Sequence, residues 1–405
     1  MKLKKIHYGF GICIGCILAL IICCGLALNA FSVTIPFVLK QNAFTNTQTS
    51  MITTMRAVGY FVSTLFFAKY YQSLGYRLGL TVSTLMTSAA YLTFMLAGSN
   101  LLAYYLGGFL TGVSNGLGSI VAVTILINRW FLEKRSTALG VCAASTGLAT
   151  VVFSPLMTRL IETLSLQICF RAVALFSTVV AVLVFLILRD DPYKIGKLPY
   201  GQKEEVKTQE AGGPGVRFST LHWWVMLLAV ALFGACATPS VSHQTVLLTT
   251  EGFSPMTAAR AYSISGAALM LGKIAFGALS DRVGRMRSTI VFCAILLVSL
   301  TMFLFLGSGS VPLAFASFAL FGVGLTVYTV GISIWTQDFA SDANRKQMLY
   351  RFQLAYAVGR LAFSTVPGIV ADRTGSYIPA YAIFLGMSVF ASAVVMFTYR
   401  KVPKQ

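Results

Sequence analysis

Apolar stretches of about 20 residues follow one another along nearly the whole chain, separated by short polar segments. A stretch of about 20 residues is long enough to cross the hydrocarbon layer of a membrane as an α-helix. Runs such as Leu18–Leu28 are apolar on every side, whereas the strands of a membrane barrel alternate in polarity. The pattern therefore predicts an all-α membrane protein with twelve transmembrane helices, at residues 9–38, 50–71, 78–98, 101–127, 136–161, 168–188, 221–249, 257–279, 288–307, 312–337, 348–371 and 379–399.

Charged residues are few, and their placement predicts the orientation of the chain in the membrane. Of the 405 residues, 57% are hydrophobic and only 11% are charged, which is atypical of soluble proteins. The net charge is nevertheless +19, because basic residues gather at the termini and in every second connection between the predicted helices. This positive-inside pattern predicts cytoplasmic termini, and basic loops beside lipid headgroups are not a nucleic-acid surface. The chain contains no Asn-x-Ser/Thr sequon, which favours a bacterial inner membrane.

One long polar segment divides the chain into two parts. Residues 189–220 are rich in charge and contain Gly212-Gly213-Pro214-Gly215, which is typical of a flexible linker. The sequence therefore predicts an N-terminal six-helix half (1–188), a cytoplasmic linker (189–220) and a C-terminal six-helix half (221–405). Landmark residues recur between the halves at offsets of 205 to 212 residues, as expected of an internal repeat. The recurring pairs are Gly75 and Gly284, Trp130 and Trp335, Gly147 and Gly359, and Pro155 and Pro367.

A short basic loop in the second half carries the motif Gly277-Ala-Leu-Ser-Asp281-Arg282-Val-Gly284-Arg285. Gly277 permits close helix approach, Asp281 can cap a helix or form an ion pair, and the arginines hold the loop in the cytoplasm. This segment resembles the signature loop of the major facilitator superfamily. The resemblance implies two pseudo-symmetric six-helix halves and secondary transport by alternating access. It also implies that the loop acts as a conformational latch, through Gly277, Asp281, Arg282, Gly284 and Arg285.

The first half contains a degenerate copy of this loop, Ala68-Lys-Tyr-Tyr-Gln72-Ser-Leu-Gly75-Tyr-Arg77. The copy keeps Gly75, but Gln72 stands where the aspartate of the motif belongs. The resemblance then implies a latch that is complete in one half only.

Charged side chains at membrane depth are the best guide to a transport pathway, because each costs about 2.5 to 3.5 kcal/mol at a helix centre. Lys273 lies eight residues before Asp281, about 12 Å from that end of its helix, and Arg360 lies near the midplane. Arg56 lies nearer the outside, roughly two turns into its helix. All twelve carboxylates fall in the linker or at helix ends. We therefore expect Lys273 and Arg360 to bind an anionic substrate, with Arg56 as a further candidate; alternatively, one of them reaches a lipid headgroup or binds helix carbonyls.

A cation pair in the eighth and eleventh helices is also what oxalate:formate antiporters and monocarboxylate transporters use to bind carboxylates. The sequence resembles that branch, and Lys273 and Arg360 stand at the two cationic positions. The segment from Asn128 to Gly140, Asn-Arg-Trp-Phe-Leu-Glu-Lys-Arg-Ser-Thr-Ala-Leu-Gly, is similar as well. The resemblance implies a small mono- or dicarboxylate as substrate, such as oxalate, formate, lactate or pyruvate.

The chain departs from that branch at the carboxylates that couple transport to protons. Animal monocarboxylate transporters have an Asp-Gly pair in the first helix and an Asp four residues before the cation of the eighth. Here the first helix reads Leu28-Asn29 and the other position is Leu269. The departures favour exchange or uniport over proton symport. His243 is a possible proton site, although a lone histidine is often an ordinary hydrogen-bonded polar group.

Four further residues lie at a depth suitable for lining a central cavity: Asn29, Phe31, Tyr328 and Tyr356. Aromatic residues make up 13% of the chain, so most of them pack helices or face lipid.

Two other functions are compatible with the same fold. An exporter of drugs or metabolites usually needs a deep acidic residue to attract cations, and the sequence places none there. A membrane sensor that binds an anion without moving it would need a signalling domain. Three histidines and no carboxylate at membrane depth give no catalytic or metal constellation, so we expect no enzyme, cofactor or metal. The expected partners are a small organic anion and the lipid bilayer, with a monomer as the default of the family.

Overall fold

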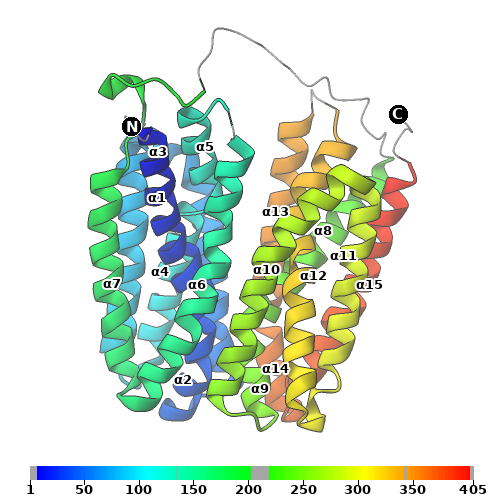
Figure 1. The fold of residues 1–405 in the computed structure, drawn as a ribbon. Helices are drawn as coiled ribbons and strands as arrows, with labels where there is room; N and C mark the ends of the chain where they lie inside the picture. Colours follow the sequence, from blue (N-terminus) through cyan, green and yellow to red (C-terminus); the bar gives the residue numbers. More distant parts are fainter. Residues whose placement is uncertain (1–6, 134, 202–218, 342–343, 402–405) are drawn as a thin grey trace, which may run out of the picture. The chain divides into compact units, whose positions relative to one another are not determined.

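The computed structural model describes residues 7–133, 135–201, 219–341 and 344–401, and within these ranges the chain folds into helices joined by short turns (Figure 1). The only strand-like pairing in the described ranges is an isolated bridge between Phe131 and Tyr200. The predicted all-α class is confirmed.

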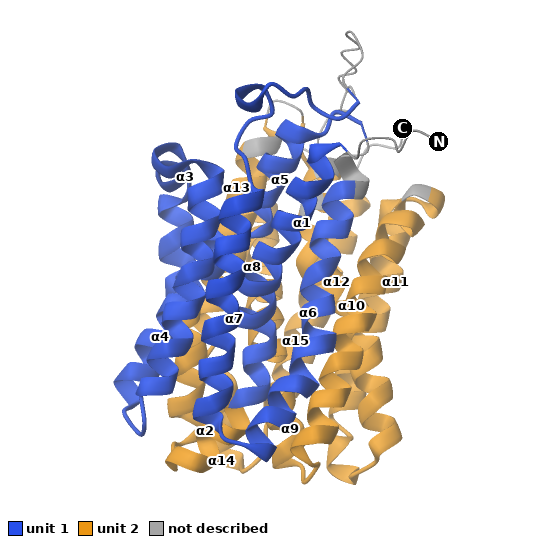
Figure 2. Cartoon of the chain, turned by 60° about the vertical axis from the view of Figure 1, so that its left-hand side comes forward, with its two compact units in different colours: residues 1–34, 58–206 blue, residues 35–57, 207–405 orange. Residues whose placement is uncertain are grey.

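The chain forms two compact units (Figure 2). Unit 1 comprises residues 1–34 and 58–206, and unit 2 comprises residues 35–57 and 207–405. Residues 35–57, which end the first predicted helix and begin the second, therefore pack with the C-terminal part of the chain. The pair of six-helix halves stays a prediction from the sequence repeat.

Unit 1 consists of long helices and of two irregular segments in the first of them. Its elements are α1 (Tyr8–Leu20), the π-helical η1 (Ile21–Asn29), the 3-10 helix η2 (Ala30–Thr34), α3 (Asn46–Leu96) beyond Ala57, α4 (Leu101–Leu117), α5 (Ile120–Trp130), α6 (Arg135–Thr163), α7 (Leu166–Ile187) and η3 (Tyr193–Ile195).

The first transmembrane helix changes its winding along its length. It runs from α1 through η1 and η2 into α2 without an intervening loop. A Cβ added at Gly25 would collide with the Cβ of Ala149, so the glycine allows η1 to pack closely against α6. The predicted helix 9–38 thus has about the right extent but not a regular geometry. Irregular winding within a helix frequently accompanies functional sites.

Helix α3 contains two of the predicted transmembrane helices. It bends at Gly75, whose φ of +73° lies in the left-handed region that glycine adopts without strain. In the described part of the chain, eleven helices are long and apolar enough to cross a membrane. Since α3 provides two crossings, the prediction of twelve is confirmed.

Unit 2 is built from helices that pack in pairs, with α10 against α12, α8 against α13 and α11 against α12. Its elements are α2 (Ile35–Asn42), α3 as far as Ala57, α8 (Thr220–Ser242), α9 (Gln244–Thr250), α10 (Pro255–Val283), α11 (Arg285–Phe303), η4 (Leu306–Ser308), α12 (Val311–Phe339), α13 (Arg345–Phe363), α14 (Val366–Thr374) and α15 (Ile378–Tyr399).

Two predicted helices of unit 2 are interrupted. The predicted helix 221–249 breaks at His243 into α8 and α9, four residues after Pro239. The predicted helix 348–371 breaks between α13 and α14, where Pro367 lies in the first turn of α14. Proline removes a backbone donor and disfavours helical geometry in the residue before it, which explains why regular winding stops near both prolines.

Candidate functional site

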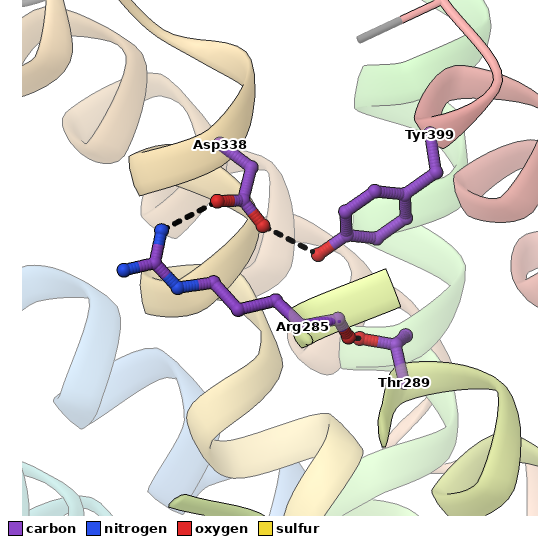
Figure 3. Close-up of polar contacts among 4 residues, drawn as sticks. All are labelled: Arg285, Thr289, Asp338 and Tyr399. Carbon is purple, nitrogen blue, oxygen red and sulfur yellow. Dashed lines mark hydrogen bonds and ion pairs between the residues drawn. The ribbon is translucent and has the colours of Figure 1, made fainter. Parts of the chain in front are cut away.

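The signature loop joins three helix ends of unit 2. Helix α10 ends at Val283, Gly284 has a φ of +91°, and α11 begins at Arg285. Arg285 donates to Asp338 Oδ1 of α12 at 2.6 Å, and the Tyr399 hydroxyl of α15 donates to Asp338 Oδ2 at 2.9 Å (Figure 3). Asp338 therefore holds α11, α12 and α15 together.

The remaining residues of the loop make fewer contacts. Gly277 and Arg282 are exposed, and a Cβ added at Gly277 would meet no atom within 4 Å. The close helix approach expected at Gly277 is thus not seen within this structure. The side chain of Asp281 lies outside the described residues. A latch role for this loop stays a prediction.

The degenerate copy in unit 1 recruits a carboxylate from elsewhere in the chain. Asp190, which follows α7, accepts hydrogen bonds from the backbone nitrogens of Tyr76 and Arg77 at 2.6 and 2.7 Å. These nitrogens begin the second part of α3, directly after Gly75, and a carboxylate stabilises such a helix N-terminus. The adjacent cavity of about 510 Å³ is lined by residues that include Gln72, Arg129 and Asp190.

The three cations predicted at membrane depth all belong to unit 2. Arg56 lies on α3 and is 1% exposed, and Arg360 lies on α13 and is 5% exposed. Lys273 lies on α10 and is half-buried. The two arginines are thus held in the interior, where a guanidinium can bind a carboxylate through two parallel hydrogen bonds.

The four predicted cavity residues have different surroundings. Tyr356 is half-buried on α13, whereas Tyr328 is 1% exposed and its hydroxyl shares a 2.7 Å hydrogen bond with Ser388. In unit 1, Asn29 donates to the carbonyl of Thr146 at 3.3 Å. Phe31 stacks on Phe94 with ring centroids 4.9 Å apart. These contacts are those of packed or hydrogen-bonded residues, and substrate contacts there stay a prediction.

The predicted proton site, His243, is completely buried, and its imidazole is of the residue type that ordinarily titrates between about pH 5 and 8. Its Nδ1 lies 2.8 Å from the Pro239 carbonyl, which can only accept, so Nδ1 carries the proton. In the neutral ring, Nε2 then accepts from the Ser50 hydroxyl at 2.8 Å. The ring also stacks on Tyr377 at 5.6 Å.

A second group of contacts, which we call the clasp, joins the start of α3 to α14. Asp372 accepts from the backbone nitrogens of Asn46 and Thr47 at 2.9 and 2.8 Å, and from Asn46 Nδ2 at 2.9 Å. The Tyr377 hydroxyl donates to Asn46 Oδ1 at 3.0 Å. A Cβ at Gly368 would collide with Ser50 Oγ and with the Asn46 carbonyl, so the glycine is required for this close approach.

Sequence reasoning assigned Asp190 to the linker and left Asp338 and Asp372 as carboxylates at helix ends. Their roles depend on partners 53 to 326 residues away, which a single sequence does not reveal. Gln244 was also missed: it is completely buried, and neither polar atom of its side chain has a hydrogen-bond partner among the described residues. The signal in the sequence was the side-chain amide of Gln244 within a predicted transmembrane helix.

The sequence model of the Major Facilitator Superfamily matches residues 17–364. Monocarboxylate transporter 12 of Rattus norvegicus is 24% identical over 315 residues, which are 72% of this chain and 65% of that protein. The Oxalate:formate antiporter of Oxalobacter formigenes is 27% identical over 189 residues, which are 47% of this chain and 41% of that protein. The chain thus spans between 41% and 65% of the length of these relatives.

The fold is also similar to that of solved structures. A D-xylose-proton symporter has a TM-score of 0.75 and 13% sequence identity, and the similarity covers 98% of both chains. At this identity the similarity concerns the fold and not the substrate.

Proposed function

This chain belongs to the Major Facilitator Superfamily, and from that premise we propose that it moves a small organic anion across the membrane by alternating access. The chain is a multi-pass membrane transporter and not an enzyme. The anion as substrate, with anion exchange or uniport as the mode of transport, is the proposal. The proposed location is a bacterial inner membrane, with both termini in the cytoplasm and the protein a monomer.

The burial of Arg360 carries the proposal. Its side chain is 5% exposed within a helix that is long and apolar enough to cross a membrane. A guanidinium at such a depth is expensive to insert, and residues of this kind usually serve a transport pathway. The names of two relatives, a monocarboxylate transporter and an oxalate:formate antiporter, support a carboxylate.

Two further residues are assigned supporting roles. Lys273 on α10 supplies a second cation, as its half-buried position permits. Tyr356 lies one turn before Arg360 on the same helix, and a tyrosine hydroxyl at that position can donate to a bound carboxylate. Protonation of His243 at Nε2 requires the Ser50 hydroxyl to stop donating to that nitrogen, whereas the bond from Nδ1 to the Pro239 carbonyl can remain, so proton coupling through His243 requires a local rearrangement at Ser50.

The test is uptake of labelled carboxylates into proteoliposomes, with and without internal carboxylate and with and without a pH gradient. Uptake that internal carboxylate accelerates and that a pH gradient does not change would support exchange. Arg360→Gln is expected to reduce uptake to the level of empty liposomes, because the main anion-binding group is removed. The matched control is Arg351→Gln, an exposed arginine on the same helix, which is expected to leave uptake unchanged.

Two results would contradict the proposal. Unchanged uptake in Arg360→Gln would remove the binding role of this residue. No carboxylate uptake by the wild type under any condition would favour an exporter of drugs or metabolites instead.

A further inference from the structure

Two buried arginines of unit 2 lie near a set of contacts that has an antiparallel register. Arg56 lies on α3, whose start contacts α14 and the junction before it, and Arg360 lies on α13, four residues before Ser364 in that junction. From one contact to the next, the residue number rises by about four on α3 and falls by about four on the segment from α14 back to Ser364. The contacts join Asn46 to Asp372, Ser50 to Gly368, Thr53 to the carbonyl of Ser364, and the hydroxyl of Thr54 to that of Thr365.

One more step in the same register places residue 58 opposite Arg360, so Arg56 is displaced from that position by two residues, about 3 Å along the helix. The distances from the clasp agree with this placement. Arg56 follows Asn46 by ten residues, about 15 Å along α3, and Arg360 precedes Asp372 by twelve residues, about 18 Å along its own helices. The sequence alone had placed Arg56 nearer the outside than Arg360; the register places them at nearly the same level.

Each arginine lies within about one turn of a residue that makes such a contact. Thr53 contacts the carbonyl of Ser364, and Arg56 lies three residues further along α3, on the same face. Ser364 lies four residues after Arg360 and donates to its carbonyl at 2.6 Å, so these two share a face as well. The exposed fractions of 1% for Arg56 and 5% for Arg360 show that both side chains are buried.

The charges around this level are predominantly positive. Of the carboxylates described in unit 2, Asp372 lies in the clasp, Asp338 binds Arg285, and Glu251 accepts from Ser376. His243, which is close enough to Arg56 to interact electrostatically, donates to Pro239 and accepts from Ser50 as a neutral ring. Two guanidinium groups at one level of a buried region create a positive potential that favours a doubly charged anion over a singly charged one.

We propose that Arg56 and Arg360 together form a site for an organic dianion, with Arg56 as the residue that selects an anion with two carboxylates over one with a single carboxylate. This proposal rests on the proposed function and adds to it. Arg360 binds the first carboxylate of every substrate, and Arg56 binds the second. The clasp fixes the start of α3 and thereby the position of Arg56.

The experiment measures uptake of a labelled C2 or C4 dicarboxylate and of the corresponding monocarboxylate into proteoliposomes. The wild type is expected to prefer the dicarboxylate at least about ten-fold, the ratio that about 1.4 kcal/mol corresponds to. Arg56→Gln is expected to remove that preference by lowering dicarboxylate uptake, while monocarboxylate uptake stays within about two-fold. Arg360→Gln is expected to lose both.

Two controls keep the result interpretable. Arg56→Lys retains the charge and is expected to recover part of the preference, although lysine lacks the bidentate fork. Lys69→Gln removes an exposed cation from the same helix and is expected to change neither uptake. Thermal unfolding of each purified variant, with and without dicarboxylate, reports folding and binding separately, since a bound ligand raises the midpoint.

The outcomes separate this proposal from the one before it. A wild type that transports carboxylates without preferring dicarboxylates, or an Arg56→Gln variant that is folded and keeps the preference, overturns the dianion site and leaves the anion transporter standing. If Arg56→Gln does not fold, an Arg56→Lys variant that keeps part of the dicarboxylate preference in both uptake and unfolding supports the site, and one whose uptake of both substrates falls equally overturns it. A wild type that transports no carboxylate contradicts the proposed function itself.

Discussion

At the scale of single residues, two aspartates of this chain stabilise the N-termini of helices. Helix α3 contains two helix N-termini, one at Asn46 and one after Gly75, and each is bonded by a carboxylate from a distant segment. Asp372 binds the first within unit 2, and Asp190 binds the second within unit 1. In each case free backbone donors and the positive end of the helix dipole meet a negative charge. These aspartates thus have structural partners that account for their presence in so apolar a chain.

Gly75→Ala is expected to lower the free energy of unfolding by about 1 to 2 kcal/mol, since a φ of +73° strains any residue with a Cβ. The new Cβ would also lie 2.7 Å from Asp190 Oδ2, so the carboxylate would have to move. Thermal unfolding of the purified protein measures the change. Gly140→Ala is the control, because a Cβ there meets no atom within 4 Å; equal midpoints for the two variants would contradict the strain argument.

At the scale of elements, the clasp determines which part of α3 packs with which helices. Residues 46–57 follow the register set by Asp372 and Gly368, and the rest of the helix belongs to unit 1. A helix that is shared in this way has to be anchored at its start. Three hydrogen bonds to one carboxylate and the close approach at Gly368 provide the anchor.

Asp372→Ala is expected to destabilise the protein by about 1 to 3 kcal/mol, because three donors lose a charged acceptor. Uptake of dicarboxylate is expected to fall with it, since the start of α3 positions Arg56. The control is Glu162→Ala, which removes an exposed carboxylate from the end of α6. A fully stable Asp372→Ala variant with normal uptake would show that the close packing at Gly368 suffices to hold α3.

Much of the fold could be predicted because apolar runs of membrane length are a strong signal, and the helices lie close to the predicted ranges. The irregular winding of η1 and η2 could not, because it depends on the approach of Ala149 to Gly25 from a distant helix. Of the candidate site, the depth of Arg360 followed from its spacing to the helix end. The proposed pairing of Arg56 with Arg360 did not, because it depends on the register between α3 and α14.

At the scale of the whole molecule, the bend of α3 determines how many times the chain crosses the membrane. Helix α3 has 51 residues, about 77 Å at 1.5 Å per residue, which is more than twice the hydrocarbon thickness. A single crossing of that length would leave apolar residues in water. A turn at Gly75 instead gives two crossings, and the charge pattern predicts that the basic residues around this turn lie on the cytoplasmic side.

Single cysteines at Ser73 and Ser99 test this arrangement, because both serines are exposed and lie on opposite sides of the second crossing. Seven of the eight native cysteines are buried and Cys24 is half-buried, so a membrane-impermeant maleimide has little background to report. Ser99→Cys is expected to be labelled in intact cells, and Ser73→Cys only after permeabilisation. Labelling of both cysteines from the same side of the membrane would mean that α3 does not cross the membrane twice. Labelling of Ser73→Cys in intact cells, and of Ser99→Cys only after permeabilisation, would mean that the charge asymmetry does not set the orientation of this chain.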